Sequence, residues 1–273
     1  MQIGNSEMRT INPGIVRSHI LQQSKRANVG HIGSALSIVE LLCALYGSIL
    51  RCASLSDPER DRFVLSKGHA ALSLYVVFYL KGWITKGELD SYCGDCTLLG
   101  VHPEHRSAGV DFCTGSMGMG IGFAAGAALA ARLQGSDRRA FAILSDGECN
   151  EGSVWEAAMF AGQHRLSNLT ALLDCNGQQA FGYTKDVLNA DNLAERWAAF
   201  GWDVQVIDGH DIAALEHLLS TLDYRGSRPH LLLARTVFGK GVSYMEGKIK
   251  WHYSPMNDQE YGQALREIYQ GQE

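Results

Sequence analysis

The stretch that decides the fold is Phe141-Ala142-Ile143-Leu144-Ser145, an apolar run that leads directly into Asp146-Gly147-Glu148. A second apolar run, residues 169–173, leads in the same way into Asp174-Cys175-Asn176. Such runs indicate strands buried on both faces of a parallel sheet. Open α/β sheets bind ligands at the edge where their strands end. Asp146 and Asn176 are therefore expected to meet at that edge, where their oxygens suit a hard cation such as Mg²⁺.

The rest of the chain alternates strand and helix patterns around these two runs. Strands are predicted at 62–66, 139–145, 169–175, 203–207 and 230–237. Helices are predicted at 12–27, 36–48, 69–81, 86–93, 118–133, 152–165, 191–200 and 211–222. This alternation implies βαβ units with right-handed crossovers. We therefore predict an α/β fold, a doubly wound and mainly parallel sheet with helices on both faces.

Composition favours one large domain that binds neither nucleic acid nor membrane. The 273 residues are 46% hydrophobic and show no linker or repeat, which predicts a single domain over 1–273 with a C-terminal extension from about residue 240. The net charge is −5 and basic residues are scattered, with Arg132, Arg138 and Arg139 read as a solvated loop. The chain start does not resemble a signal peptide, and Glu40 interrupts the most apolar stretch. A cytoplasmic protein is expected.

The cysteines favour neither a disulfide framework nor a metal site. Seven cysteines spread over a long chain fit reduced thiols. Cys93 and Cys96 form the only CxxC, without the second pair that structural zinc needs or the helix start that a redox dithiol needs.

The loop after Ser145 can be read from its charges. A diphosphate ester carries about three negative charges, of which Mg²⁺ balances two, and the backbone N–H groups of the helix expected after Gly152 suit the remainder. Asp146 and Asn176 would then ligate the metal, together with a backbone carbonyl from the irregular segment Gly177-Gln178. Alternatively, Asp146 caps the next helix and Asn176 makes a turn. Spacing alone leaves both interpretations open.

Five motifs in order resemble the transketolase family. They are Gly30-His31-Ile32-Gly33, the segment DRFVLSKGHA at 61–70, His102-Pro103-Glu104, Thr114-Gly115-Ser116-Met117-Gly118, and the Asp146 loop with Trp155-Glu156-Ala157. The resemblance implies that thiamine diphosphate is bound with Mg²⁺, or with Ca²⁺ or Mn²⁺ in its place. It implies the thiamine diphosphate-binding fold, and in particular its diphosphate-binding domain.

The resemblance also assigns roles to single residues. Metal ligands would be Asp146, Asn176 and the carbonyl of Gln178. The cofactor-binding set would comprise His69, Gly115, Met117, Gly147, Glu148, Asn176 and Glu151, with Glu151 matching an acidic residue at the family's subunit contact. Catalytic roles fall to His31, His102 and His252, because imidazoles can exchange protons near neutral pH while they hydrogen-bond a polyol. Met117 could equally be core packing. Four histidines outside the motifs are read as structural: His19, His164, His217 and His230.

In the family, a glutamate that activates the cofactor belongs to a second domain, which this sequence does not contain. The chain therefore resembles the N-terminal subunit of a split transketolase. A separate pyrimidine-binding subunit is expected, in an α₂β₂ assembly, with the isolated chain inactive. The reaction implied is transfer of a two-carbon ketol unit from a ketose donor, a sugar or sugar phosphate, to an aldehyde acceptor.

Two departures and three alternatives accompany this interpretation. Ser145 replaces a usual glycine, and Val101 separates Gly100 from His102, changes that would suit a specialised enzyme. Residues 120–125 fit the G-x-G-x-x-A pattern of nicotinamide dehydrogenases, although a loop, not a strand, is expected before them. The chain could also be a non-catalytic interaction subunit that retains the fold. It could, finally, serve another thiamine diphosphate-dependent C–C lyase or transferase.

Overall fold

A five-stranded parallel sheet forms the centre of the computed structural model, which describes residues 11–188 and 191–271. The strand order is β1-β2-β3-β7-β6. The strands are β1 (Arg62–Leu65), β2 (Ala140–Ser145), β3 (Leu169–Cys175), β6 (Asp203–Asp208) and β7 (His230–Arg235). Each lies where the sequence predicts a strand. In the register of β2 and β3, Ser145 pairs with Asp174, so the two apolar runs end side by side.

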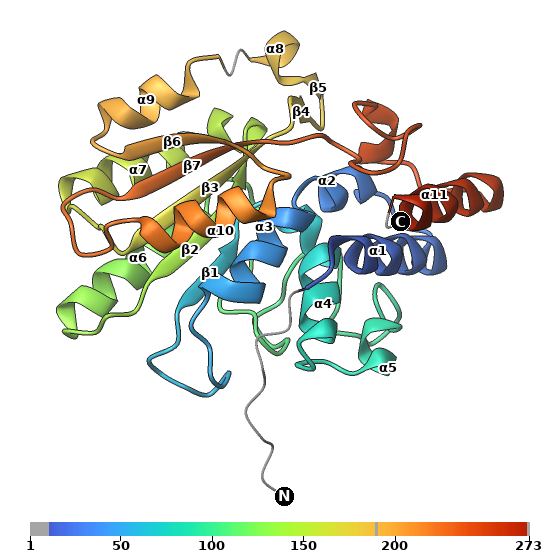
Figure 1. Cartoon of the computed structure of the whole chain (residues 1–273), viewed down its shortest axis with the longest axis horizontal. Helices are drawn as coiled ribbons and strands as arrows, with labels where there is room; N and C mark the ends of the chain where they lie inside the picture. The colour runs from blue at the N-terminus through green and yellow to red at the C-terminus, as the bar shows by residue number, and fades with distance from the viewer. Residues whose placement is uncertain (1–10, 189–190, 272–273) are drawn as a thin grey trace, which may run out of the picture.

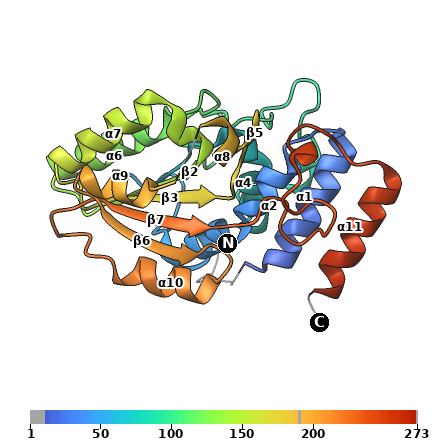
Figure 2. The same cartoon turned by 90° about the horizontal axis from the view of Figure 1, so that it is seen from above.

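Helices cover both faces of the sheet, which confirms the doubly wound α/β class. One face carries α6 (Gly120–Leu133), α7 (Gly152–Gln163) and α9 (Leu193–Ala199), and the other carries α3 (Val39–Ala44) and α10 (Ile212–Thr221) (Figure 1, Figure 2). Successive residues of β2 point to opposite faces. Phe141 and Ile143 belong to the core under α10, whereas Ala142 and Leu144 belong to the core under α6 and α7.

A further group of helices lies beside the sheet, next to the edge where its strands end (Figure 2). It consists of α1 (Pro13–Ala27), α2 (Ile32–Ser37), α4 (Ala71–Leu80), the short α5 (Lys86–Leu89) and α11 (Asp258–Gln270). Three short 3₁₀ turns lie at the ends of strands and helices: η2 (Gly68–Ala70) precedes α4, η3 (Gly147–Asn150) lies between β2 and α7, and η4 (Ile249–His252) precedes α11. The small hairpin β4 (Gln178–Gln179) and β5 (Gly182–Tyr183) and the helix α8 (Thr184–Val187) follow β3. No helix in the described ranges is long and apolar enough to cross a membrane.

Two predicted helices differ from the structure. The helix predicted at 36–48 is broken into α2, α3 and a π-helical turn, η1 (Leu45–Ile49), with the break at Ile38 (φ −104°, ψ 11°). The helix predicted at 86–93 ends at Leu89, and the chain continues as a turn in which Cys93 adopts a left-handed φ of 54°.

The segment after residue 240, expected from the sequence only as an extension, is ordered. It folds back along α1, where Arg17 Nε donates to the carbonyl of Lys240 (3.0 Å), and it ends in α11. A capping box starts α11, with Glu260 N donating to Asn257 Oδ1 (2.8 Å) and Asn257 N to Glu260 Oε2 (2.9 Å).

Candidate active site

Three of the predicted histidines form one cluster beside the ends of the strands. The ring centroids lie 5.6 Å apart for His31 and His69, 5.3 Å for His31 and His252, and 5.5 Å for His69 and His252. They come from three distant segments: the residue before α2, the turn η2 and the turn η4. The backbone closes this arrangement, because His31 N donates to the carbonyl of His252 (3.0 Å).

Gly30 permits the close approach of the first and last of these segments. A Cβ atom at Gly30 would lie 2.3 Å from the carbonyl oxygen of Tyr253, too close for any side chain. His31 follows with a left-handed φ of 60°, a conformation that costs energy in a residue with a side chain. The backbone of His31 is therefore strained where it places the imidazole in the cluster.

Burial keeps these imidazoles neutral. It lowers the pKa of His252 to about 4, with the charges of His31 and Lys67 acting in the same direction. Burial and then the Lys67 ammonium lower the pKa of His69 well below its usual value, and burial and then His102 lower the pKa of His31. The Nδ1 atoms of His31 and His252 are buried and have no hydrogen-bond partner within the described chain. They are available to a polar ligand.

His102 adjoins the cluster from the loop that precedes α6. Its charge would lower the pKa of His31 and of His69, and burial lowers its own pKa. Tyr75 donates from its hydroxyl to the carbonyl of His102 (3.0 Å), and a Cβ atom at Gly115 would lie 3.3 Å from the His102 ring. Met117, on the same loop as Gly115, is half-buried and belongs to neither apolar core.

Asp146 lies where β2 ends, as predicted, and is 3% exposed. Its Oδ1 accepts from Gly147 N (2.8 Å) and its Oδ2 from Gly177 N (2.7 Å), so the carboxylate joins the ends of β2 and β3. Gly147 lets these loops meet, because a Cβ atom there would lie 2.7 Å from Gln179 Cβ. Burial and the charge of Asp174 raise the pKa of Asp146 to about 7. A bound cation would favour its ionised form.

Asn176 and Gln178 lie next to Asp146 on the loop after β3. Asn176 donates from Nδ2 to Asp174 Oδ2 (2.8 Å) and accepts at Oδ1 from Gln178 N (3.0 Å). Gln178 Oε1 and Gln179 Nε2 are buried without a partner in the part of the chain that the structure describes. Buried carboxylate and amide oxygens, together with unpaired polar atoms, fit a divalent cation and its polar ligand.

The helix-cap interpretation of Asp146 is compatible with this arrangement. Its acceptance from Gly147 N caps the 3₁₀ turn η3, and the bond from Gln178 N to Asn176 Oδ1 makes an Asx-type turn. Glu151, exposed before α7, makes no side-chain cap there. The second bond of Asp146, to Gly177 N across the loops, goes beyond what a cap requires.

Glu148 holds three of the motif segments together. The carboxylate is fully buried and accepts from Gly118 N (2.8 Å), from Ser145 N (3.3 Å) and from the Ser66 hydroxyl. Burial raises the pKa of this group. Glu148 therefore links the segments that contain Ser66, Gly118 and Ser145.

Sequence reasoning missed a buried ion pair between Lys67 and Asp174, whose side chains are both 0% exposed. Lys67 Nζ also lies 3.2 Å from the carbonyl of Ser34, and Asp174 accepts from Ser37 Oγ (2.8 Å) and from Thr236 Oγ1. The pair therefore connects η2 with α2, β3 and the end of β7. The available signal was a lysine directly after the apolar strand β1, in Ser66-Lys67-Gly68.

Three other features could indicate a metal, redox or dinucleotide site: the cysteines, a group of metal-ligand side chains on the surface, and the G-x-G-x-x-A pattern. All seven cysteines are free thiols, including Cys93 and Cys96. One group of residues that could hold a metal comprises Glu104, His105 and Cys113 on the surface after His102, and it was not singled out from the sequence. The G-x-G-x-x-A pattern begins α6 itself and follows a loop, so the strand that a dinucleotide site requires is absent from the described residues before it.

Comparison with known proteins gives one consistent result. Residues 9–271 match the family profile described as transketolase, thiamine diphosphate binding domain. Over 254 residues the chain is 38% identical to one of the subunits of apulose-4-phosphate transketolase from Phocaeicola vulgatus, covering 92% of this chain and 90% of that protein. Over 257 residues it is 38% identical to the 6-deoxy-6-sulfo-D-fructose transketolase subunit SqwG from a Clostridium species, covering 93% and 94%.

Longer relatives match over only part of their length. Human transketolase is 35% identical over 257 residues, which cover 93% of this chain and 41% of that protein. The crystal structure of transketolase from Campylobacter jejuni superposes with a TM-score of 0.89 at 28% identity, covering 97% of this chain and 43% of that one. The chain thus spans less than half of these two proteins and about nine-tenths of the two subunits above.

Proposed function

The chain belongs to the transketolase family, and from this premise we propose that it is the diphosphate-binding subunit of a two-chain, thiamine diphosphate-dependent transketolase. The observation that carries the proposal is the length match: proteins named as subunits align over about nine-tenths of their length, human transketolase over 41% of its own. Retention of the buried Asp146 and of the histidine cluster supports a catalytic over a purely structural subunit.

The cofactor in this proposal is thiamine diphosphate with Mg²⁺, or with Ca²⁺ or Mn²⁺ in its place. Asp146, Asn176 and the Gln178 carbonyl would hold the metal. The cofactor-binding set would be His69, Gly115, Met117, Gly147, Glu148, Asn176 and Glu151, in which Glu148 acts by bracing the loops through its three accepted hydrogen bonds. When bound, the cofactor supplies the nucleophilic carbon and the electron sink for breaking and forming a carbon–carbon bond.

His31, His102 and His252 would orient the donor sugar and move its protons. Their lowered pKa values keep the rings neutral at pH 7, so that each can accept a proton from a hydroxyl at one nitrogen and donate at the other. The unpaired Nδ1 atoms of His31 and His252 are free for such bonds. Polyhydroxylated donors need a lining of this kind.

The substrate class we propose is a ketose that carries an anionic group. Two relatives are named for apulose-4-phosphate and 6-deoxy-6-sulfo-D-fructose, sugars with a phosphate and a sulfonate respectively. A ketol unit would pass from such a donor to an aldehyde acceptor.

Exposed apolar side chains support a multi-chain assembly, for which we propose α₂β₂. On α7, Met159 and Phe160 are 48% and 40% exposed; just before α6, Met119 is 49% exposed. On the hairpin that follows Gln178, Phe181 is 86% exposed. Exposed apolar side chains mark a protein contact where they form one contiguous patch, and we propose that these residues lie in such a contact. The partner subunit would carry the glutamate that activates the cofactor, and the assembly is expected in the cytoplasm.

The test is to purify the native protein with its associated chains and to titrate both the complex and the isolated chain with thiamine diphosphate and Mg²⁺. We expect a stoichiometric second subunit, cofactor binding and ketol transfer by the complex, and no transfer by the isolated chain. Binding by neither form would point to a non-catalytic module. Turnover by decarboxylation in place of ketol transfer would point to another thiamine diphosphate enzyme.

His102→Ala in the complex is expected to lower kcat by about 10²–10⁴, the usual contribution of a group that transfers protons, while the cofactor Kd changes little. Steady-state kinetics with a ketose donor and calorimetric titration of the cofactor measure the two quantities separately. His217→Ala on the exposed side of α10 is the matched control and should leave both unchanged. Loss of cofactor binding with normal turnover at saturating cofactor would reverse the assignment of His102.

A further inference from the structure

A cavity lies at the opposite edge of the sheet from the histidine cluster. Its volume is about 620 Å³, and its lining includes residues that directly precede two strands: Arg139 before β2 and Asn168 before β3. The metal-site residues Asp146 and Asn176 follow the other ends of the same strands. We name this cavity the arginine pocket, after its five lining arginines, Arg51, Arg132, Arg139, Arg165 and Arg225.

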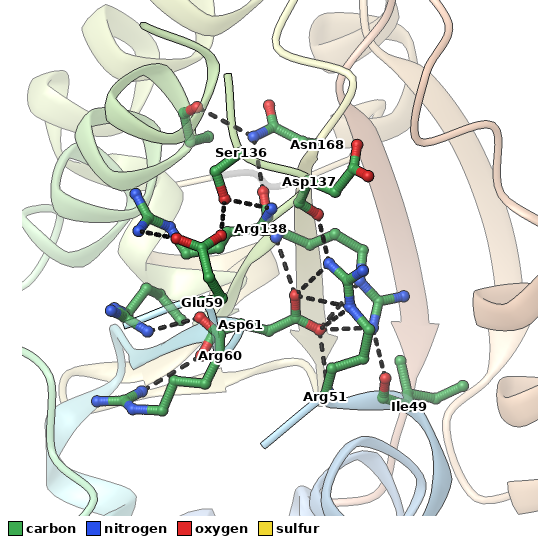
Figure 3. A network of polar contacts seen from close by, with 12 residues as sticks. Ile49, Arg51, Glu59, Arg60, Asp61, Ser136, Asp137, Arg138 and Asn168 are labelled. Carbon is green, nitrogen blue, oxygen red and sulfur yellow. Dashed lines mark hydrogen bonds and ion pairs between the residues drawn. The ribbon is translucent and has the colours of Figure 1, made fainter. Parts of the chain in front are cut away.

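Two of these arginines share a single carboxylate. Asp61, whose side chain is 0% exposed, accepts from Arg51 (2.8 Å) and from Arg139 (2.5 Å) (Figure 3). Arg139 also lies over the Tyr224 ring, with its guanidinium carbon 4.7 Å from the centroid. This arrangement fixes the inner wall of the pocket and leaves one of the two positive charges unbalanced.

The positive charges of the other three arginines are balanced by even less negative charge. Among the described residues, Arg132 donates only to neutral acceptors, the carbonyls of His164 and Arg165. The guanidinium of Arg165 has no hydrogen-bond or ion-pair partner among the residues that the structure describes. Arg225 pairs with Asp137 (3.0 Å), but these side chains are 83% and 72% exposed, so the pair contributes little. Asp137 is the only acidic residue among the described residues of the lining, and Asp61 lies behind the lining, so five arginines face two carboxylates and the pocket carries an excess of about three positive charges.

The lining also contains a buried hydrogen-bond acceptor without a partner among the described residues, Asn168 Oδ1. Asn168 is 7% exposed, and its Nδ2 donates to the carbonyls of Ala128 and Arg138, both at 3.0 Å. Its Oδ1 is buried and has no partner in the described part of the chain. A ligand hydroxyl would satisfy this acceptor, since buried polar atoms are rarely left unpaired.

We propose that the arginine pocket binds an organic phosphate, at a site separate from that of the cofactor. Guanidinium groups bind phosphate oxygens through paired N–H donors, and a phosphorylated sugar or nucleotide would also offer a hydroxyl to Asn168 Oδ1. A volume of about 620 Å³ suits a small molecule of that size. The arginines come from separate segments of the chain, which the fold brings to one place.

The test is calorimetric titration of the native complex with inorganic pyrophosphate in EDTA, where metal-dependent cofactor binding is suppressed. We expect saturable binding that weakens at least about tenfold in the double variant Arg165→Ala/Arg225→Ala, because two charge-assisted hydrogen-bond donors to the phosphate are lost. Neither arginine braces the fold, so the variant should remain folded. Arg266→Ala on α11 is the matched control and should bind pyrophosphate normally.

Three outcomes would overturn the proposal: no saturable binding, equal binding by the double variant, or loss of binding in Asp146→Ala. The last would place pyrophosphate in the cofactor site. Parallel titrations with ribose 5-phosphate and with ATP then distinguish a phosphorylated sugar from a nucleotide. The compound that resembles the natural ligand should bind more tightly than pyrophosphate.

Discussion

Lys67→Met is expected to lower the free energy of unfolding by about 3–5 kcal/mol, the usual cost of leaving one partner of a buried ion pair without the other. Lys67 and Asp174 are both fully buried, and the ammonium also contacts the carbonyl of Ser34. Without it, Asp174 would keep only neutral donors such as Ser37 Oγ and Asn176 Nδ2. Asp146, whose carboxylate is also buried, lies at the adjacent strand end, and its backbone N–H donates to the carbonyl of Asp174 (3.2 Å).

Chemical denaturation at neutral pH measures this effect, and two further variants isolate its cause. Lys67→Met/Asp174→Asn should be less destabilised than the single variant, because it removes the stranded charge as well. Lys86→Met, which breaks an exposed pair with Asp90, should cost only about 0.5 kcal/mol. Equal losses for Lys67→Met and Lys86→Met would contradict a structural role for the buried pair.

The sequence predicted the strands well because their signal is local. Apolar runs such as residues 169–173 have one explanation in an α/β protein, a strand covered on both faces. Once those strands are parallel, the residues after them must share an edge, which is why Asp146 and Asn176 could be placed together. The family resemblance then implied that His31, His69 and His252 lie near the cofactor, and the structure brings their rings together.

Features that depend on partners distant in sequence were not predictable in this way. The ion pair of Lys67 and Asp174 joins residues 107 positions apart, and nothing near Lys67 indicates which carboxylate it meets. The arginine pocket was missed for the same reason. The sequence indicates only a solvated loop at this place, because Arg165 and Arg225 come close to the other arginines only in the folded chain. The break at Ile38 could not be found from periodicity, because every residue of α2 and α3 is buried and no polar face repeats along them. By contrast, α11 has a readable signal in its capping box, although the sequence prediction did not include it.

Asp146→Ala is expected to abolish Mg²⁺-dependent binding of thiamine diphosphate in the assembled complex, with affinity reduced by about 100-fold or more. Loss of an outer-shell partner of a metal ligand already costs about 10–100-fold, and a carboxylate that ligates directly should matter at least as much. The fold should persist, because the substitution removes a buried carboxylate whose ionised form is disfavoured by burial and by Asp174.

Asp146→Asn separates the metal role from the helix-cap role. Asparagine can still accept the bond from Gly147 N that caps η3, but it carries no charge for the cation. If the carboxylate binds the metal, calorimetric titration should find both variants defective, while the unfolding midpoint of Asp146→Asn, which keeps the acceptor oxygen, stays closer to that of the parent than the midpoint of Asp146→Ala. Asp211→Ala is the control: it removes the N-cap of α10 (Ala214 N to Asp211 Oδ1, 2.9 Å) and should cost about 1 kcal/mol of stability with cofactor binding intact. Undiminished affinity in Asp146→Asn would assign Asp146 to capping alone and remove it from the proposed metal site.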